Sequence, residues 1–173
     1  HGVIWRSYIP ELLQAYEEFA TFQSVDKAVI VYESVWKHTQ MMAEALAEGM
    51  GRNGVCVKIF KCSMTSPAII QKELLDAKAI LVGSGNYNNA MSGSIAAFLE
   101  KLISCKVKNK KGLGFGSYGW ANLVTKEINA RLVKAGITLL NDEVVSQNYT
   151  PSEEDLDALM ELGKQIAEEI KAM

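Results

Sequence analysis

Three short segments of the sequence carry residues suited to holding a phosphate and a flat ring. The first, residues 33–39, reads Glu-Ser-Val-Trp-Lys-His-Thr and leads directly into a helical pattern. Its hydroxyls, together with backbone N–H groups at the positive end of a helix dipole, could receive a terminal phosphate, and Lys37 or His38 could add charge. A plain helix cap by Ser34 or Thr39 is the alternative interpretation. The segment contains no glycine, which excludes the Walker motif of P-loop NTPases.

The second segment, residues 83–91, reads Gly-Ser-Gly-Asn-Tyr-Asn-Asn-Ala-Met. Gly and Asn tolerate positive φ, so the chain can bend sharply here. Its backbone N–H and C=O groups could then address the polar edge of a heteroaromatic ring. Taken alone, the segment is equally typical of a simple turn between a strand and a helix.

The third segment, residues 112–120, reads Gly-Leu-Gly-Phe-Gly-Ser-Tyr-Gly-Trp. Its glycines allow close backbone approach to a ligand, and Tyr118 and Trp120 offer aromatic faces. Residues 114–119 also match the dinucleotide fingerprint G-x-G-x-x-G, with Asp142 at about 20 residues beyond, which would indicate NAD. Against NAD, Gly114 falls inside a predicted strand, and the match lies in the fourth strand–helix unit instead of the first. An ordinary turn with packed aromatic side chains also stays open.

The elements that position these segments alternate regularly between strand and helix. Near-continuous apolar runs are typical of parallel strands buried on both faces, with amphipathic helices between them. We therefore predict an α/β, flavodoxin-like, doubly wound five-stranded parallel sheet of order 2-1-3-4-5, with helices on both faces. In this topology a ligand binds at the carboxyl ends of strands 1 and 3, flanked by the loop after strand 4. The predicted strands are residues 28–32, 55–60, 79–83, 113–117 and 138–145.

Composition narrows the function classes further. The chain has 173 residues, 49% of them hydrophobic, which suits one globular domain, and its net charge of −2 comes without a basic stripe for nucleic acid. The apolar runs are too short to span a bilayer and no signal segment opens the chain, so we expect a cytoplasmic protein without membrane contact. Three cysteines lack the paired spacing of a zinc site and are expected to be reduced thiols.

Residues 34–39, 83–89 and 115–120 together resemble the flavodoxin-like domain of the flavodiiron proteins, also called A-type flavoproteins, over about residues 27–173. The opening residues, His-Gly-Val-Ile-Trp-Arg, resemble the junction between that family's metallo-β-lactamase-like diiron domain and its flavin domain. The resemblance implies that residues 1–25 are a connector remnant of an upstream diiron domain and that residues 26–173 form the FMN-binding domain. His1 resembles a diiron ligand, but the rest of that site would lie upstream. The sequence departs from the family pattern at Lys37, where glycine is usual, and at Gly85, where proline is common.

By this resemblance the chain is an FMN-binding electron-transfer domain of a flavodiiron-type oxidoreductase. The first segment would bind the ribityl phosphate, and the other two would enclose the isoalloxazine, with no catalytic acid–base residue required. Electrons would pass from a flavin reductase or rubredoxin-like donor to a diiron centre that reduces O2 or NO, usually in a homodimer, although this chain alone would not perform that reduction. An NAD-binding Rossmann-like domain and a ligand-free interaction module remain alternatives. The expected cofactor-binding residues are Ser34, Val35, Trp36, Lys37, His38, Thr39, Ser84, Gly85, Asn86, Tyr87, Asn88, Asn89, Ser117, Tyr118, Gly119 and Trp120.

Overall fold

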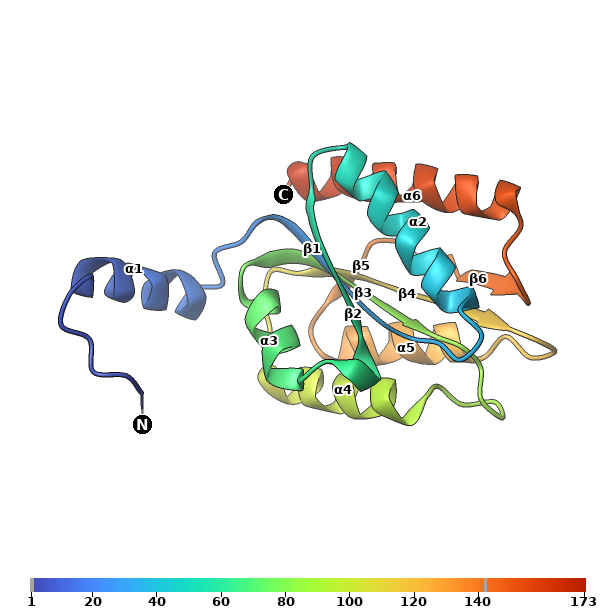
Figure 1. Cartoon of the computed structure of the whole chain (residues 1–173), viewed down its shortest axis with the longest axis horizontal. Helices are drawn as coiled ribbons and strands as arrows, with labels where there is room; N and C mark the ends of the chain where they lie inside the picture. The colour runs from blue at the N-terminus through green and yellow to red at the C-terminus, as the bar shows by residue number, and fades with distance from the viewer. Residues whose placement is uncertain (1, 142) are drawn as a thin grey trace.

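A parallel β-sheet runs through the molecule with helices packed on both of its faces (Figure 1). The computed structural model describes residues 2–141 and 143–173. The strand order is β2-β1-β3-β4-β5, and β6 pairs with β4 beyond the end of β5. This order confirms the predicted flavodoxin-like α/β fold. The strands are β1 (Val25–Glu33), β2 (Cys56–Lys61), β3 (Ala77–Ser84), β4 (Lys111–Tyr118), β5 (Thr138–Leu139) and β6 (Val145–Asn148).

The prediction of one continuous fifth strand over residues 138–145 was wrong. The structure divides it into β5 and β6, which both pair in parallel with β4, first opposite Lys111 and then opposite Phe115. Between them, Asn141 Oδ1 accepts a hydrogen bond of 2.9 Å from the Glu143 N–H. An Asn side chain that bonds the backbone two residues later favours a turn over a continuous ladder. Asp142 lies outside the described residues.

Seven helical segments accompany the sheet in the described part of the chain. Helices α2 and α6 cover one face, and α3, α4 and α5 cover the other (Figure 1). The strands alternate accordingly, so that Ile30 and Leu81 point to the first layer, whereas Val31 and Val82 point to the second. The segments are α1 (Ile9–Ala20), α2 (His38–Arg52), the 3-10 helix η1 (Cys62–Met64), α3 (Pro67–Leu75), α4 (Gly93–Cys105), α5 (Val124–Lys134) and α6 (Glu153–Lys171).

Helices α2 and α6 pack closely because two glycines face each other between them. A Cβ added at Gly163 would lie 2.5 Å from the Leu46 carbonyl oxygen, and one at Gly49 would meet the Met160 carbonyl group. Neither position therefore has room for a side chain. The contact matters for the site because α2 begins at the carboxyl edge of the sheet and α6 follows the last loop of that edge.

Local sequence signals define the ends of two helices. Ser152 Oγ caps α6 by accepting from the Asp155 N–H at 3.2 Å, and Asp155 Oδ2 accepts from the Ser152 N–H at 2.9 Å. This reciprocal pair is a capping box. After α5, Gly136 adopts φ +85°, the left-handed conformation that glycine tolerates best.

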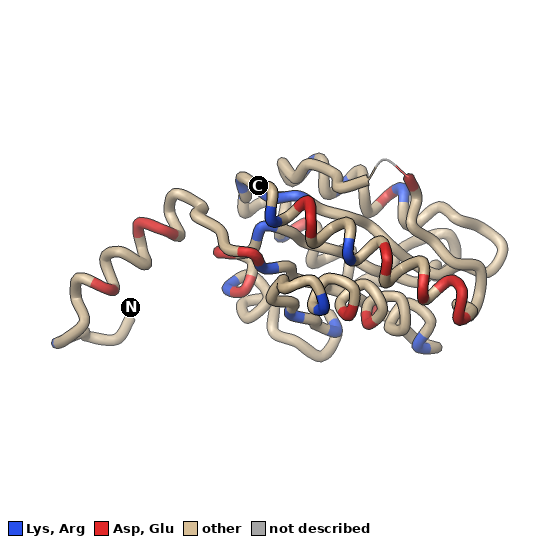
Figure 2. The backbone as a smooth tube through the Cα atoms, turned by 90° about the horizontal axis from the view of Figure 1, so that it is seen from above, with Lys and Arg blue, Asp and Glu red and all other residues tan. Residues whose placement is uncertain are grey.

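Helix α1 lies away from the sheet and its helical layers (Figures 1 and 2). None of its residues is buried, and the apolar side chains of Ile9, Leu13, Tyr16 and Phe19 are exposed. The segment that was expected to be a connector, residues 1–25, thus ends where β1 begins, and its assignment to a separate domain stays a prediction. Among the described residues, no helix has the length and apolar character needed to cross a membrane.

Candidate functional site

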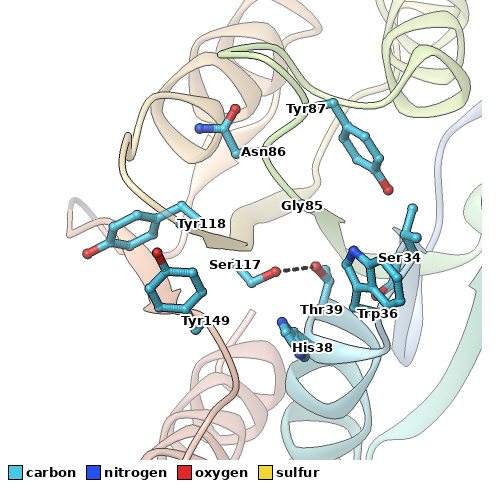
Figure 3. A pocket seen from close by; sticks show the side chains of 12 residues that line it. Ser34, Trp36, His38, Thr39, Gly85, Asn86, Tyr87, Ser117, Tyr118 and Tyr149 are labelled. Atoms are coloured by element: carbon cyan, nitrogen blue, oxygen red, sulfur yellow. Dashed lines mark hydrogen bonds between the residues drawn. The ribbon is translucent and has the colours of Figure 1, made fainter.

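A cleft of about 310 Å³ opens at the carboxyl edge of the sheet, at the ends of β1, β3 and β4 (Figure 3). A neighbouring hollow of about 270 Å³ shares three of its residues and adds Asn88, Asn89 and Trp120. The three predicted segments therefore meet in space, as the topology requires. Lys37 and Ser84 line neither cavity. The residues that line the cleft are Ser34, Val35, Trp36, His38, Thr39, Gly85, Asn86, Tyr87, Ser117, Tyr118, Gly119 and Tyr149.

The first loop brings the N-terminus of α2 to the cleft without a side-chain cap. The N-cap residue is Lys37, and within residues 2–141 and 143–173 no side-chain hydrogen bond caps this helix. A plain cap by Ser34 or Thr39 is therefore wrong as an explanation of this loop. Lys37 adopts φ +66°, the conformation for which glycine is best suited, at the position where the family pattern has glycine. The N–H groups of the first turn, which have no side-chain cap among the described residues, and the helix dipole favour an anion at this end of the cleft.

A buried carboxylate that the sequence reasoning missed supports the first loop. Glu33 ends β1, and its Oε2 accepts hydrogen bonds from the Ser63 N–H at 2.9 Å and the Ser94 hydroxyl at 3.2 Å. Its Oε1 accepts from the Ser34 N–H at 3.2 Å and lies 3.7 Å from Lys61 Nζ. Burial raises the pKa of Glu33, but the hydrogen bonds from Ser63, Ser34 and Ser94 outweigh it and lower the pKa below its ordinary value.

In the second loop, some residues maintain the turn and others line the cleft. Ser84 is fully buried, and its hydroxyl donates to the Gly85 carbonyl oxygen at 2.8 Å and accepts from the Ser92 N–H at 3.0 Å. Its side chain thus maintains the turn and does not reach the cleft. Asn88 and Asn89 adopt φ +50° and +66°, consistent with the tolerance expected of asparagine in this bend.

Asn86 has a buried oxygen atom without a hydrogen-bond partner. Its backbone N–H donates to the Ser117 carbonyl oxygen at 3.0 Å, and its side-chain Nδ2 donates to the Ala121 carbonyl oxygen. With Nδ2 so engaged, Oδ1 is left buried with no donor among the described residues. A buried acceptor of this kind is costly unless a ligand or water supplies the missing donor. Asn86 lines both cavities through its other atoms, since Oδ1 itself is buried.

The third loop contributes Ser117, Tyr118 and Gly119 to the cleft, whereas Trp120 is 86% exposed and lines only the neighbouring hollow. Tyr149 is a cleft residue that sequence reasoning missed. It follows β6, at the same carboxyl edge, and its N–H donates to the Tyr118 carbonyl oxygen at 2.8 Å. The signal was an aromatic residue just past the last strand, which was obscured because the strand was predicted to end at residue 145.

The glycines of the dinucleotide fingerprint serve the packing of the fold in this structure. Gly114 lies within β4, and its N–H donates to Asn129 Oδ1 of α5 at 2.7 Å. A Cβ at Gly114 would lie 2.5 Å from the same Oδ1, and one at Gly116 would meet the Ser84 carbonyl oxygen. These glycines allow α5 and β3 to pack against β4 and do not form a loop around a pyrophosphate. The geometry therefore disfavours NAD.

Comparison with known proteins agrees with this arrangement. The family model described as flavodoxin matches residues 30–163. The chain belongs to the flavodoxin family. A solved structure of a flavodoxin from the domain Archaea is 30% identical with a TM-score of 0.75, and the match covers 84% of this chain and 99% of that flavodoxin. Membership of the flavodoxin family indicates FMN as the cofactor of this chain.

Longer proteins match this flavodoxin-family chain over nearly its whole length. Nitric oxide reductase from Moorella thermoacetica is 39% identical over 170 residues, which are 98% of this chain and 43% of that protein. The structure of rubredoxin oxygen:oxidoreductase from Desulfovibrio gigas is 32% identical with a TM-score of 0.89, covering 94% of this chain and 40% of that one. The chain thus spans less than half the length of these flavodiiron-type relatives.

The residues of the cleft fit FMN in chemical type. The uncapped N-terminus of α2 suits the phosphate, and the exposed aromatic side chains of Trp36 and Tyr149 suit a flat ring. That these particular side chains contact FMN stays a prediction. Among residues 2–141 and 143–173, no three His, Cys, Asp or Glu side chains gather as a metal site. His1, which resembles a diiron ligand, lies outside the described residues.

Proposed function

We propose that the cleft holds FMN and that the chain is the electron-transfer domain of a flavodiiron-type oxidoreductase. The first loop, residues 34–39, binds the ribityl phosphate with the N–H groups of α2 and the Thr39 hydroxyl. The second and third loops, residues 84–89 and 117–120, surround the isoalloxazine. Bound FMN supplies reversible uptake of one or two electrons. The protein's part is to orient the ring, exclude water and supply hydrogen bonds, so no acid–base residue is needed.

The observation that carries this proposal is that the similarity to longer oxidoreductases extends to residues before residue 30, where the match to the flavodoxin family model begins. That model begins at residue 30, whereas the match to the Moorella thermoacetica nitric oxide reductase covers 98% of this chain and so includes most of the segment before β1. The archaeal flavodoxin, which is matched almost completely, covers only 84% of the chain. The N-terminal segment is therefore a feature shared with the longer oxidoreductases. Its unburied helix α1 supports a role as a connector.

In this proposal, residues 1–25 link an upstream diiron domain to the FMN-binding domain of residues 26–173. Electrons enter from a rubredoxin-like protein or a flavin reductase and pass to the diiron centre of the same or a neighbouring subunit in a homodimer. The names of the relatives, a nitric oxide reductase and a rubredoxin oxygen:oxidoreductase, support NO or O2 as the final acceptor. The expected cytoplasmic location stays a prediction.

The placement of the phosphate is tested at Val35, which lines the cleft and is 61% exposed. Val35→Glu adds a negative charge to the first loop, and Val35→Gln is the matched neutral control. Unit charges about 4 Å apart interact by about 1–4 kcal/mol, so FMN should bind Val35→Glu about tenfold more weakly than Val35→Gln. Riboflavin, which lacks the phosphate, should bind both variants alike. Flavin fluorescence quenching measures both affinities, and NAD should not compete. A Val35→Glu variant that binds FMN and riboflavin with the same relative loss would contradict the phosphate placement.

Electron transfer is tested with the FMN-loaded chain under anaerobic conditions. Chemically reduced rubredoxin, and separately NADH with a flavin reductase, are mixed with the chain, and bleaching of the visible flavin absorption is followed. At least one donor should reduce the bound FMN faster than it reduces free FMN at the same concentration. If both donors reduce free FMN at least as fast, the role as an electron-accepting domain is wrong.

A further inference from the structure

Tyr149 holds a backbone conformation that is unfavourable for a large side chain. Its φ is +59°, in the left-handed region, where a Cβ crowds the carbonyl oxygen and where Gly or Asn is usual. Such a conformation persists only where the surroundings impose it, and it concentrates at functional sites. Tyr149 lies at the rim of the cleft, in the loop between β6 and α6.

Hydrogen bonds on both sides of Tyr149 impose this conformation. Its own N–H donates to the Tyr118 carbonyl oxygen at 2.8 Å, and Asn148 Nδ2 donates to the Gly119 carbonyl oxygen at 2.5 Å. On the other side, Thr150 Oγ1 lies 2.9 Å from His38 Nε2, at the start of α2. Residues 148–150 therefore connect the third loop to the first loop, and we refer to them as the fourth loop.

The ring of Tyr149 adds an aromatic wall to the cleft. A Cβ added at Gly119 would lie 3.5 Å from Cε1 of Tyr149, so the ring lies over this glycine. Figure 3 shows Tyr149 and Tyr118 at the opposite side of the cleft from Trp36. Tyr149 is 60% exposed, which leaves much of its apolar surface to be covered when a ligand enters.

We propose that Tyr149 is a flavin-binding residue, held by the fourth loop so that its ring contacts the isoalloxazine. The chain retains a strained backbone at this position because the strain orients an aromatic side chain toward the cleft. This inference rests on the proposed placement of FMN in the cleft. It adds a fourth contact region to the three that the sequence indicates, and it assigns that region to the ring and not to the phosphate.

The test uses three substitutions of Tyr149 and one control elsewhere. Tyr149→Gly and Tyr149→Asn remove the ring and introduce residues that accept positive φ, whereas Tyr149→Phe retains the ring. Lys106→Gly is the control, because Lys106 also has positive φ, at +48°, but it follows α4, outside the residues that line the cleft. Affinities for FMN and riboflavin are measured by fluorescence quenching, and melting temperatures are measured for the FMN-free proteins.

Tyr149→Gly and Tyr149→Asn should bind FMN and riboflavin about three- to tenfold more weakly, with the same loss for both, because aromatic contact with the ring is independent of the phosphate. Their melting temperatures should be equal to or above that of the parent protein, since the strain is relieved. Tyr149→Phe and Lys106→Gly should retain the parent affinities. The inference is overturned if the ring-free variants bind both flavins as tightly as the parent, or if they lose affinity only for FMN. A failure of Val35→Glu to discriminate FMN from riboflavin would instead overturn the placement of the phosphate, so the two failures are distinguishable.

Discussion

Thr39 Oγ1 lies 3.1 Å from Ser117 Oγ, so the first turn of α2 and the end of β4 are joined by a hydrogen bond across the floor of the cleft (Figure 3). The two residues are 78 positions apart in the sequence. Thr39 is only 1% exposed, which makes its hydroxyl a fixed group and not a mobile surface one. The pair connects the loop proposed for the phosphate to the loop proposed for the ring.

Replacing Thr39 with Val should weaken FMN binding about three- to tenfold, because a hydrogen bond contributes about 0.5–1.5 kcal/mol and Val retains the shape without the hydroxyl. Thr39→Ser keeps the hydroxyl and serves as the control, with an affinity close to that of the parent. Fluorescence titration of FMN gives both constants. A Thr39→Val variant with the parent affinity would show that this hydroxyl does not take part in binding.

Glu33 should make the stability of the fold depend on acid pH. Its folded-state pKa is lowered from the ordinary 4.5, so its contribution is complete above the pKa of the unfolded chain and is lost as the pH falls through the folded value. Urea midpoints measured downward from neutral pH should therefore fall more steeply for the parent than for Glu33→Gln. At neutral pH, Glu33→Gln should reduce the unfolding free energy by about 1–3 kcal/mol, because its amide NH2 must face a backbone donor. Parallel pH profiles for the two proteins would count against this role.

The glycine contact between α2 and α6 should be intolerant of even one methyl group. Gly163→Ala should lower the unfolding free energy by about 1–3 kcal/mol, because the added Cβ would overlap the Leu46 carbonyl oxygen. Gly51→Ala is the matched control, since it lies within α2 with no atom within 4 Å of an added Cβ. It should raise stability by about 0.5–1 kcal/mol through helix propensity. Equal effects of the two substitutions, measured by urea unfolding, would refute the close-packing argument.

Asn129 should be required for the stability of β4 and not for nucleotide binding. Asn129→Leu removes the acceptor of the Gly114 N–H and leaves that donor buried, at an expected loss of about 1–3 kcal/mol in unfolding free energy. Arg131→Leu, on the same helix, removes ion pairs with Glu100 and Glu127, whose side chains are 62% and 43% exposed, and should have a smaller effect. Chemical unfolding compares the two. A larger loss for Arg131→Leu would contradict the assignment.

The site could be predicted from the sequence only in part. The three loops meet because each follows a parallel strand, and alternating strand and helix patterns are sufficient to predict that their carboxyl ends share an edge. Lys37 and Ser84 belong to those loops but line neither cavity, because the direction of a side chain depends on backbone dihedrals that neighbouring elements impose. For Lys37 this is the left-handed N-cap of α2, and for Ser84 it is the hydrogen bonds to Gly85 and Ser92.

The sequence by itself determined the order of the sheet and the family resemblance, since hydrophobic periodicity and short motifs extend over only a few residues. The tertiary structure decided what distant residues do together. It divided the last strand in two, buried Glu33 beneath the first loop, left Asn86 Oδ1 without a donor in the described part of the chain and brought Tyr149 to the cleft. These features depend on contacts between segments that lie far apart in the chain, and such contacts exist only after the sheet has brought the segments together.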